Sequence, residues 1–196
     1  MFENIIKNVH NRHPLIHCIT NYVSINDCAN IVLACGGAPI MAEDINEVSQ
    51  ITSICQGLDI NIGMLNDNKL SSMLKAGATA NELGIPVILD PVGAGSSDYR
   101  IKAVQNLMSN VQFGVIRGNV SEIKAIAAKQ GIHNIAAGVY ETMQKNKSAM
   151  GVEAGIADKI TDDNIKEMAD FINKLSQKTG AVIAVTGGID MVADEN

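Results

Sequence analysis

Residues 86–95, Pro86-Val87-Ile88-Leu89-Asp90-Pro91-Val92-Gly93-Ala94-Gly95, contain an apolar run that ends at a carboxylate and is followed by a glycine-rich turn. This pattern is typical of a buried parallel strand that delivers Asp90 to the edge of an α/β sheet where ligands bind. Glycines after the acid let backbone N–H groups approach an anion closely. The stretch predicts metal-assisted phosphate chemistry, although a strand that simply ends in a turn-forming Asp-Pro explains it equally well.

The composition narrows the class of protein. The chain has 196 residues, of which 46% are hydrophobic and 18% charged, with a net charge of −6. We therefore expect one α/β domain over residues 1–196 and no nucleic-acid partner, because nucleic-acid-binding domains usually carry a basic face. No apolar run approaches the roughly 20 residues that span a membrane, and the first residues lack a signal-peptide pattern. We expect a cytoplasmic protein without a membrane partner.

The cysteines and one histidine are predicted to belong to the core. The four cysteines are Cys18, Cys28, Cys35 and Cys55. They form no C-x-x-C pair and stand in apolar or helical surroundings, so we expect free, mostly buried thiols and neither zinc nor disulfides. His17 lies inside an apolar run, which favours a hydrogen-bonded core imidazole over a ligand.

Short apolar runs alternate with longer amphipathic ones along the chain. Strands are predicted at residues 14–19, 38–41, 57–62, 87–90, 114–116 and 181–186. Helices are predicted at residues 26–35, 45–55, 67–82, 99–110, 121–129 and 162–179. Asp44 is placed to cap the second of these helices, and Gly84 to stop the third. The alternation predicts crossover connections and a mostly parallel central sheet flanked by helices.

Two parts of the chain depart from this alternation. Residues 131–160 show no clear period, and we expect helix and loop outside the sheet. After the last predicted strand and Gly187-Gly188, residues 191–194 look like the start of a hairpin partner. Because a sheet edge left there would be exposed, we expect the natural chain to continue past Asn196.

Residues able to contact a ligand follow the predicted strands at the points where the strands end. The carboxyl ends of parallel strands share one edge, so these residues would line a single pocket there. Each of them is also compatible with a simple cap or turn. In chain order they are Asn21, Met41, Asn61 with Gly63, Asp90, Arg117 with Asn119 and Glu122, and Thr186 with Gly187.

The residue types in the second half of this set suit phosphate chemistry. Asp90 and Glu122 are hard oxygen donors of the kind that Mg²⁺ prefers beside substrate phosphates. Arg117 is a forked, permanent cation suited to nucleotide phosphates, with a surface ion pair as its alternative. Thr186-Gly187 offers a hydroxyl and an approachable backbone. Asn119-x-x-Glu122 is also close to a capping box, and Glu122 can serve both roles because phosphate binds at helix starts.

Six segments together form a specific pattern. They are His17-Cys18-Ile19-Thr20-Asn21-Tyr22-Val23, Pro39-Ile40-Met41-Ala42, Asn61-Ile62-Gly63, Ala80-Asn81-Glu82-Leu83-Gly84-Ile85 together with residues 86–95, Ile116-Arg117-Gly118-Asn119, and Val185-Thr186-Gly187. In this order, across about residues 14–194, they resemble the hydroxyethylthiazole kinase family of the ribokinase-like superfamily.

The resemblance implies a ribokinase-like fold and a kinase of thiamine biosynthesis and salvage. The expected reaction is the phosphorylation of the side-chain alcohol of 4-methyl-5-(2-hydroxyethyl)thiazole, with ATP as co-substrate, Mg²⁺ as cofactor and a homotrimer as the assembly. The implied thiazole contacts are Met41, Asn21, Asn61 and Gly63. The implied ATP contacts are Arg117, Thr186, Asn119 and Gly187, and the implied Mg²⁺ ligands are Asp90 and Glu122.

Two departures from the family pattern qualify this expectation. The family's Thr-Gly-x-Gly-Cys segment, which forms the anion hole and supplies the catalytic cysteine, is absent from residues 1–196, so no catalytic residue is assigned within them. The family's Lys-Gly-Val-Asp is matched best by Met150-Gly151-Val152-Glu153, after an inserted-looking stretch at residues 140–149. A catalytically incomplete ligand-binding protein on this scaffold, and a related hydroxymethylpyrimidine or pyridoxal-type kinase, stay open as alternatives.

Overall fold

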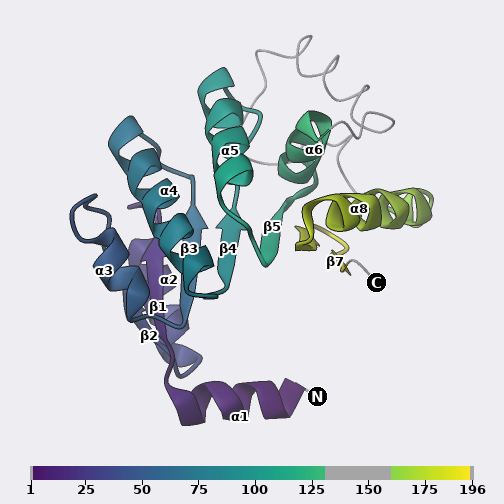
Figure 1. Cartoon of the computed structure of the whole chain (residues 1–196). Helices are drawn as coiled ribbons and strands as arrows, with labels where there is room; N and C mark the ends of the chain where they lie inside the picture. Colours follow the sequence, from purple (N-terminus) through teal and green to yellow (C-terminus); the bar gives the residue numbers. More distant parts are fainter. Residues whose placement is uncertain (1, 131–159, 195–196) are drawn as a thin grey trace. The chain divides into compact units, whose positions relative to one another are not determined.

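The computed structural model describes residues 2–130 and 160–194, and most of its elements are labelled in Figure 1. The chain divides into two compact units. The first comprises Met1–Ile88 with Asn110–Gln112, and the second comprises Leu89–Ser109 with Phe113–Asn196. Strand β4 (Val87–Asp90) therefore contributes its first residues to one unit and its last residues to the other.

The first unit is an alternation of helices and parallel strands. Its elements are α1 (Phe2–Arg12), β1 (Leu15–Ile19), α2 (Ile25–Ala34), β2 (Ala38–Ile40), α3 (Val48–Ser53), β3 (Gly57–Asn61) and α4 (Asp67–Glu82). The strands are hydrogen-bonded in the order β2-β1-β3-β4, with β1 parallel to both of its neighbours. The carboxyl ends of β1, β2 and β3 consequently lie at one edge.

The core of the first unit comes from the strands and from one face of α4. Leu58 and Ile60 of β3 are buried on the same face of the strand, because side chains two residues apart point the same way. Helix α4 begins at Asn66, whose side chain accepts the N–H of Lys69 at 2.8 Å. It ends before Gly84, which has a φ of +67°. The predicted bounds of this helix and its glycine stop are confirmed.

The second unit combines parallel pairing with a final hairpin. Its elements after β4 are α5 (Asp98–Asn110, whose last residue belongs to the first unit), β5 (Val115–Asn119), α6 (Val120–Lys129), α8 (Ile165–Thr179), β6 (Val182–Thr186) and β7 (Met191–Ala193). The strand order is β4-β5-β6-β7, with β5 parallel and β7 antiparallel to β6. The predicted hairpin is confirmed. Helix α8 packs on β6 and β7 (Figure 1) through a buried stripe that includes Phe171 and Leu175.

Several predicted boundaries differ from the structure. Helix α3 begins at Val48 and not after Asp44, because the Asp44 side chain accepts the N–H of Asn46 at 2.8 Å and so forms a turn of its own. Helix α1 was not predicted. Strand β5 continues through Arg117 to Asn119, since this stretch pairs with β6 up to Thr186. The predictions for residues 131–159, including the Met150–Glu153 match, lie outside the described residues.

The thiols are free, as predicted, but they are not uniformly buried. Cys18 and Cys55 are buried, Cys28 is half-buried, and Cys35 is exposed because it caps the end of α2. Burial raises the pKa of Cys18 to about 12 and also raises that of Cys55, so both stay protonated at neutral pH. In the part of the chain that the structure describes, no helix is both long enough and apolar enough to cross a membrane.

Candidate active site

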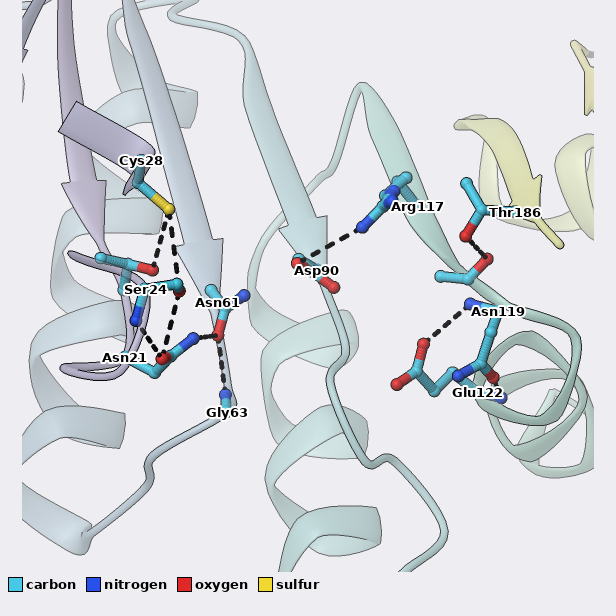
Figure 2. A network of polar contacts seen from close by, with 12 residues as sticks. Asn21, Ser24, Cys28, Asn61, Gly63, Asp90, Arg117, Asn119, Glu122 and Thr186 are labelled. Carbon is cyan, nitrogen blue, oxygen red and sulfur yellow. Dashed lines mark hydrogen bonds and ion pairs between the residues drawn. The ribbon is translucent and has the colours of Figure 1, made fainter. Parts of the chain in front are cut away.

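An asparagine pair occupies the carboxyl edge of β1 and β3 in the first unit (Figure 2). The side-chain amide of Asn21 donates to Oδ1 of Asn61 at 3.1 Å, and the same oxygen accepts the N–H of Gly63 at 2.8 Å. Asn61 ends β3, and Asn21 lies two residues beyond β1, so parallel pairing brings them to one edge. Three of the four predicted thiazole contacts are therefore neighbours.

The same pair fixes the turns around it. Oδ1 of Asn21 accepts the N–H groups of Val23 and Ser24, each at 3.1 Å, and so shapes the turn that leads into α2. A Cβ atom on Gly63 would lie 2.9 Å from Oδ1 of Asn61 and 3.0 Å from Nδ2 of Asn21. Only glycine fits there without a shift of these amides, which makes residues 61–63 a tightly packed wall of this edge.

Met41, the fourth predicted thiazole contact, directly follows β2 and is half-buried. The next residue is anchored to the core, because Nε2 of His17 lies 2.8 Å from the carbonyl oxygen of Ala42. A carbonyl can only accept, so Nε2 carries a proton, while Nδ1 lies 2.9 Å from the Thr52 hydroxyl oxygen, which itself lies 2.7 Å from the carbonyl oxygen of Val48. The prediction of a hydrogen-bonded core imidazole is confirmed.

The environment of His17 favours the neutral form of the ring. Burial lowers the pKa of the imidazole, and this effect outweighs the opposing contributions of the Ala42 carbonyl and the Glu47 carboxylate. His17 is thus uncharged, and its hydrogen bond to Ala42 fixes the segment that begins at Met41.

Sequence reasoning missed a buried lysine at the same edge. Lys69, in the first turn of α4, is 4% exposed, and its Nζ lies 2.8 Å from Oε2 of Glu43. The ammonium also donates to the carbonyl of Thr20 and lies 4.6 Å from the centre of the Tyr22 ring. A signal was present in the sequence: a lysine just after the Asn66 cap opposes the helix dipole and therefore needs an explanation.

The Glu43 carboxylate joins the lysine to the tyrosine. Its Oε1 accepts the hydroxyl of Tyr22, while its Oε2 pairs with Lys69. Burial raises the pKa of Glu43, but the bonds from Lys69 and Tyr22 outweigh it and leave that pKa below its usual value. The bond to Glu43 in turn raises the pKa of Tyr22. Glu43 is therefore held as a carboxylate and Tyr22 as a phenol.

In the second unit, the Glu122 carboxylate contacts both the end of β5 and the turn after β4. Its Oε2 accepts the N–H of Asn119 at 2.8 Å, and Asn119 Oδ1 accepts the N–H of Glu122 at 2.9 Å (Figure 2). This is a capping box at the start of α6, so the capping interpretation of Asn119-x-x-Glu122 is confirmed. Oε1 of Glu122 accepts the N–H of Gly93 at 2.9 Å, which ties the glycine-rich turn after β4 to the same carboxylate.

Asp90, at the end of β4, and Arg117, within β5, form a long ion pair. Nη1 of Arg117 lies 3.9 Å from Oδ2 of Asp90, and the two side chains are 53% and 22% exposed. At that distance and exposure the pair contributes little to stability. The Arg117 side chain is open to a ligand, which is compatible with the phosphate contact predicted for it as well as with its surface-pair alternative.

Thr186 ends β6 directly opposite Asn119 of β5. Its hydroxyl donates to the carbonyl of Gly118 at 3.4 Å, a weak bond. The N–H of Gly187 donates to Oδ1 of Asp190 at 2.9 Å and so closes the β6–β7 turn. The predicted ATP contacts Thr186, Asn119 and Arg117 are thus brought together on adjacent strands, while the Gly187 amide serves the hairpin.

The donor set predicted for Mg²⁺ is a pair of carboxylates, Asp90 and Glu122. Across residues 2–130 and 160–194, no group of three or more His, Cys, Asp or Glu side chains is placed to hold a metal ion. Each oxygen of Glu122 accepts one backbone N–H and retains a second lone pair. Asp90 and Glu122 therefore fit a magnesium ion whose coordination is completed by water and phosphate oxygens.

Comparison with known proteins shows which family the chain belongs to. The model of the hydroxyethylthiazole kinase family matches residues 6–161. This chain belongs to the hydroxyethylthiazole kinase family. A Clostridium acetobutylicum protein named hydroxyethylthiazole kinase is 52% identical over the whole chain, and a Desulfovibrio desulfuricans protein of the same name is 45% identical over 98% of it.

The structural comparison agrees with the family. A solved structure titled hydroxyethylthiazole kinase protein, from Pyrococcus horikoshii, is 31% identical, with a TM-score of 0.78 over 97% of this chain. The predicted fold class, a ribokinase-like, mostly parallel sheet flanked by helices, is confirmed. The chain spans 66% and 62% of the length of the two curated kinases, and 62% of the solved hydroxyethylthiazole kinase chain.

Proposed function

We propose that this protein transfers the γ-phosphoryl group of ATP to the side-chain alcohol of 4-methyl-5-(2-hydroxyethyl)thiazole, a step of thiamine biosynthesis and salvage. The observation that carries the proposal is the family match over residues 6–161, together with 52% identity to a protein named hydroxyethylthiazole kinase. The protein would work in the cytoplasm.

The first unit would bind the thiazole alcohol. Met41 offers an apolar side chain for the ring, and the edge beside it is built from Asn21, Asn61 and Gly63. Because the asparagine side chains are hydrogen-bonded to each other and to backbone N–H groups of the turns, this edge is already ordered before a ligand binds. Such preorganisation lowers the entropic cost of binding.

The second unit would bind ATP. Arg117 would neutralise phosphate charge, with Asn119, Thr186 and Gly187 on the neighbouring strands and turn. Asp90 and Glu122 would hold Mg²⁺, which when bound neutralises phosphate oxygens during transfer. In phosphoryl transfer, catalysis comes mostly from positioning and charge neutralisation, and these residue types supply both.

We also propose a homotrimer. Helix α2 supports subunit contacts, because it is apolar yet contains no buried residue. Ile31 and Leu33 on this helix are 61% and 56% exposed. Light scattering of the purified protein tests the assembly.

We further propose that residues 1–196 act as one domain. If so, the unfolding transition measured by the fluorescence of an attached probe should coincide with the transition measured by circular dichroism.

The deciding experiment is MgATP-dependent phosphorylation of the thiazole alcohol, with hydroxymethylpyrimidine as the competing substrate and mass spectrometry of the products. Transfer to the thiazole alone supports the proposal. Transfer to the pyrimidine would instead assign a related kinase. Calorimetric binding of the thiazole without any transfer from a folded protein would identify a ligand-binding protein on this scaffold.

A further inference from the structure

We propose that Lys69 is a positioning residue for the thiazole alcohol, because its ammonium holds together the two turns that carry Asn21 and Met41. The inference rests on the proposed function for the identity of the substrate. The contacts that support it all lie within the first unit.

Burying the ammonium group of Lys69 costs free energy, so its position needs an explanation. Its side chain is 4% exposed, whereas lysine is almost never buried without a partner. It also lies in the first turn of α4, where the helix dipole favours anions over cations. A lysine needed only for solubility would point outward, so the burial has to be explained by what the ammonium contacts.

The ammonium contacts residues on both sides of Asn21. It donates to the carbonyl of Thr20, the residue before, and lies 4.6 Å from the ring centre of Tyr22, the residue after. A cation over an aromatic face is attracted by the ring, more strongly when water is excluded. Lys69 thus fixes the backbone from which the Asn21 side chain reaches Asn61.

The same ammonium reaches the turn after β2. Its Nζ lies 2.8 Å from Oε2 of Glu43, two residues beyond Met41, and Oε1 of Glu43 accepts the Tyr22 hydroxyl. Lysine, glutamate and tyrosine therefore close a ring of contacts that ties the two turns to each other and to α4. Since His17 separately anchors Ala42, loss of Lys69 should loosen the turns without detaching the strand beneath them.

The test compares Lys69→Met with Lys75→Met in steady-state kinetics of the whole protein. Lys75 is the matched control: it lies on the same helix, and its Nζ donates at 2.8 Å to the carbonyl of Ile45, a residue outside the turn at residues 20–24. We expect Lys69→Met to raise the KM for the thiazole alcohol about tenfold or more while the KM for MgATP stays within about twofold. Lys75→Met should leave both constants within about twofold of the unsubstituted protein.

A purely stabilising lysine gives a different result. If Lys69→Met loses thermal stability but keeps its thiazole KM, or raises both KM values equally, the positioning role is wrong. Should Lys69→Met fail to fold, Glu43→Gln replaces it, because Glu43 is half-exposed and the glutamine amide loses the charge and offers one acceptor oxygen to two donors, Lys69 and Tyr22. That variant is expected to shift the thiazole KM in the same direction, and an unchanged value would overturn the proposal.

Amide hydrogen exchange separates this inference from the proposed function. The N–H groups of Val23 and Ser24 donate to Asn21, so their exchange reports on the order of that turn without any catalysis. We expect faster exchange at both amides in Lys69→Met than in Lys75→Met. If the unsubstituted protein phosphorylates no thiazole, the proposed function fails, and this measurement alone decides whether Lys69 orders the turn; equal exchange in the two variants refutes it.

Discussion

Arg100 and Glu122 hold the two polar atoms of one peptide unit. Nη1 of Arg100 donates to the carbonyl of Val92 at 2.7 Å, and Oε1 of Glu122 accepts the N–H of Gly93 at 2.9 Å. That carbonyl and that N–H belong to the same peptide plane, which leads into Gly93 at a φ of +67°. The turn that follows Asp90 is consequently oriented from two helices, α5 and α6.

Glu122→Gln is expected to destabilise the protein in the absence of any ligand. The glutamine amide can accept through one oxygen only, so the N–H of Gly93 or that of Asn119 loses its partner. An unsatisfied buried N–H costs about 1–3 kcal/mol, and because both N–H groups are only partly buried we expect a loss at the lower end of that range in chemical denaturation without Mg²⁺. A stability equal to that of the unsubstituted protein would assign Glu122 to ligand binding alone.

Asp90→Asn is expected to cripple turnover and to leave the fold intact. The ion pair of Asp90 with Arg117 is long and partly exposed, so its loss should cost no more than about 1 kcal/mol. The removed charge would, however, weaken the hold on Mg²⁺, and we expect kcat to fall about a hundredfold or more. Near-normal turnover in this variant would contradict the metal role.

Arg117→Ala separates the two substrates. The Arg117 side chain is 53% exposed within β5, where nucleotide phosphate would reach it. We expect the KM for ATP to rise about tenfold while the KM for the thiazole alcohol changes little. Steady-state kinetics with each substrate varied in turn measures both, and equal increases would count against a nucleotide contact.

Gly63→Ala is expected to damage the thiazole edge. The added Cβ would lie within 3.0 Å of both asparagine side chains, so either the Asn21–Asn61 bond or the turn must move. We expect a thiazole KM raised about tenfold with little change for ATP. Gly188→Ala is the control, since a Cβ there meets nothing within 4 Å. Comparable kinetics of the two variants would show that the edge does not contact the substrate.

His17 is expected to make stability fall in mild acid. Burial lowers its folded-state pKa below 6.5, so the unfolded chain takes up a proton first as the pH drops. The contribution of His17 is therefore complete above about pH 6.5 and is lost as the pH falls through the lowered folded pKa. Free energies of unfolding at pH 7.5 and 5.5 should differ more in the unsubstituted protein than in His17→Gln. A difference of equal size in both proteins would rule this out.

Local signals predicted some elements to the residue. The apolar run at Val87–Asp90 and the helix Asp67–Glu82 have the predicted bounds, because a proline, a cap and a glycine stop mark their ends in the sequence itself. The Asn119–Glu122 capping box was also visible from its spacing. Where a boundary is encoded by neighbours in the chain, sequence reasoning finds it.

Contacts between distant segments were not predictable in the same way. Arg117 lies inside β5 because pairing with β6 extends that strand past its apolar residues. Lys69 is buried by Thr20, Tyr22 and Glu43, which come from turns far from it in sequence. The periodicity of α4 says which face is apolar but gives no partner for a lysine.

The uneven exposure of the thiols allows one cysteine to be labelled selectively with a spectroscopic probe. Cys18 and Cys55 are buried with raised pKa values, whereas Cys35 is exposed at the end of α2. A maleimide-linked fluorophore or spin label should therefore attach at Cys35 well before it reaches the buried pair. It would report on the environment of the apolar helix α2 and so test the proposed subunit association, with no cysteine engineered into the chain.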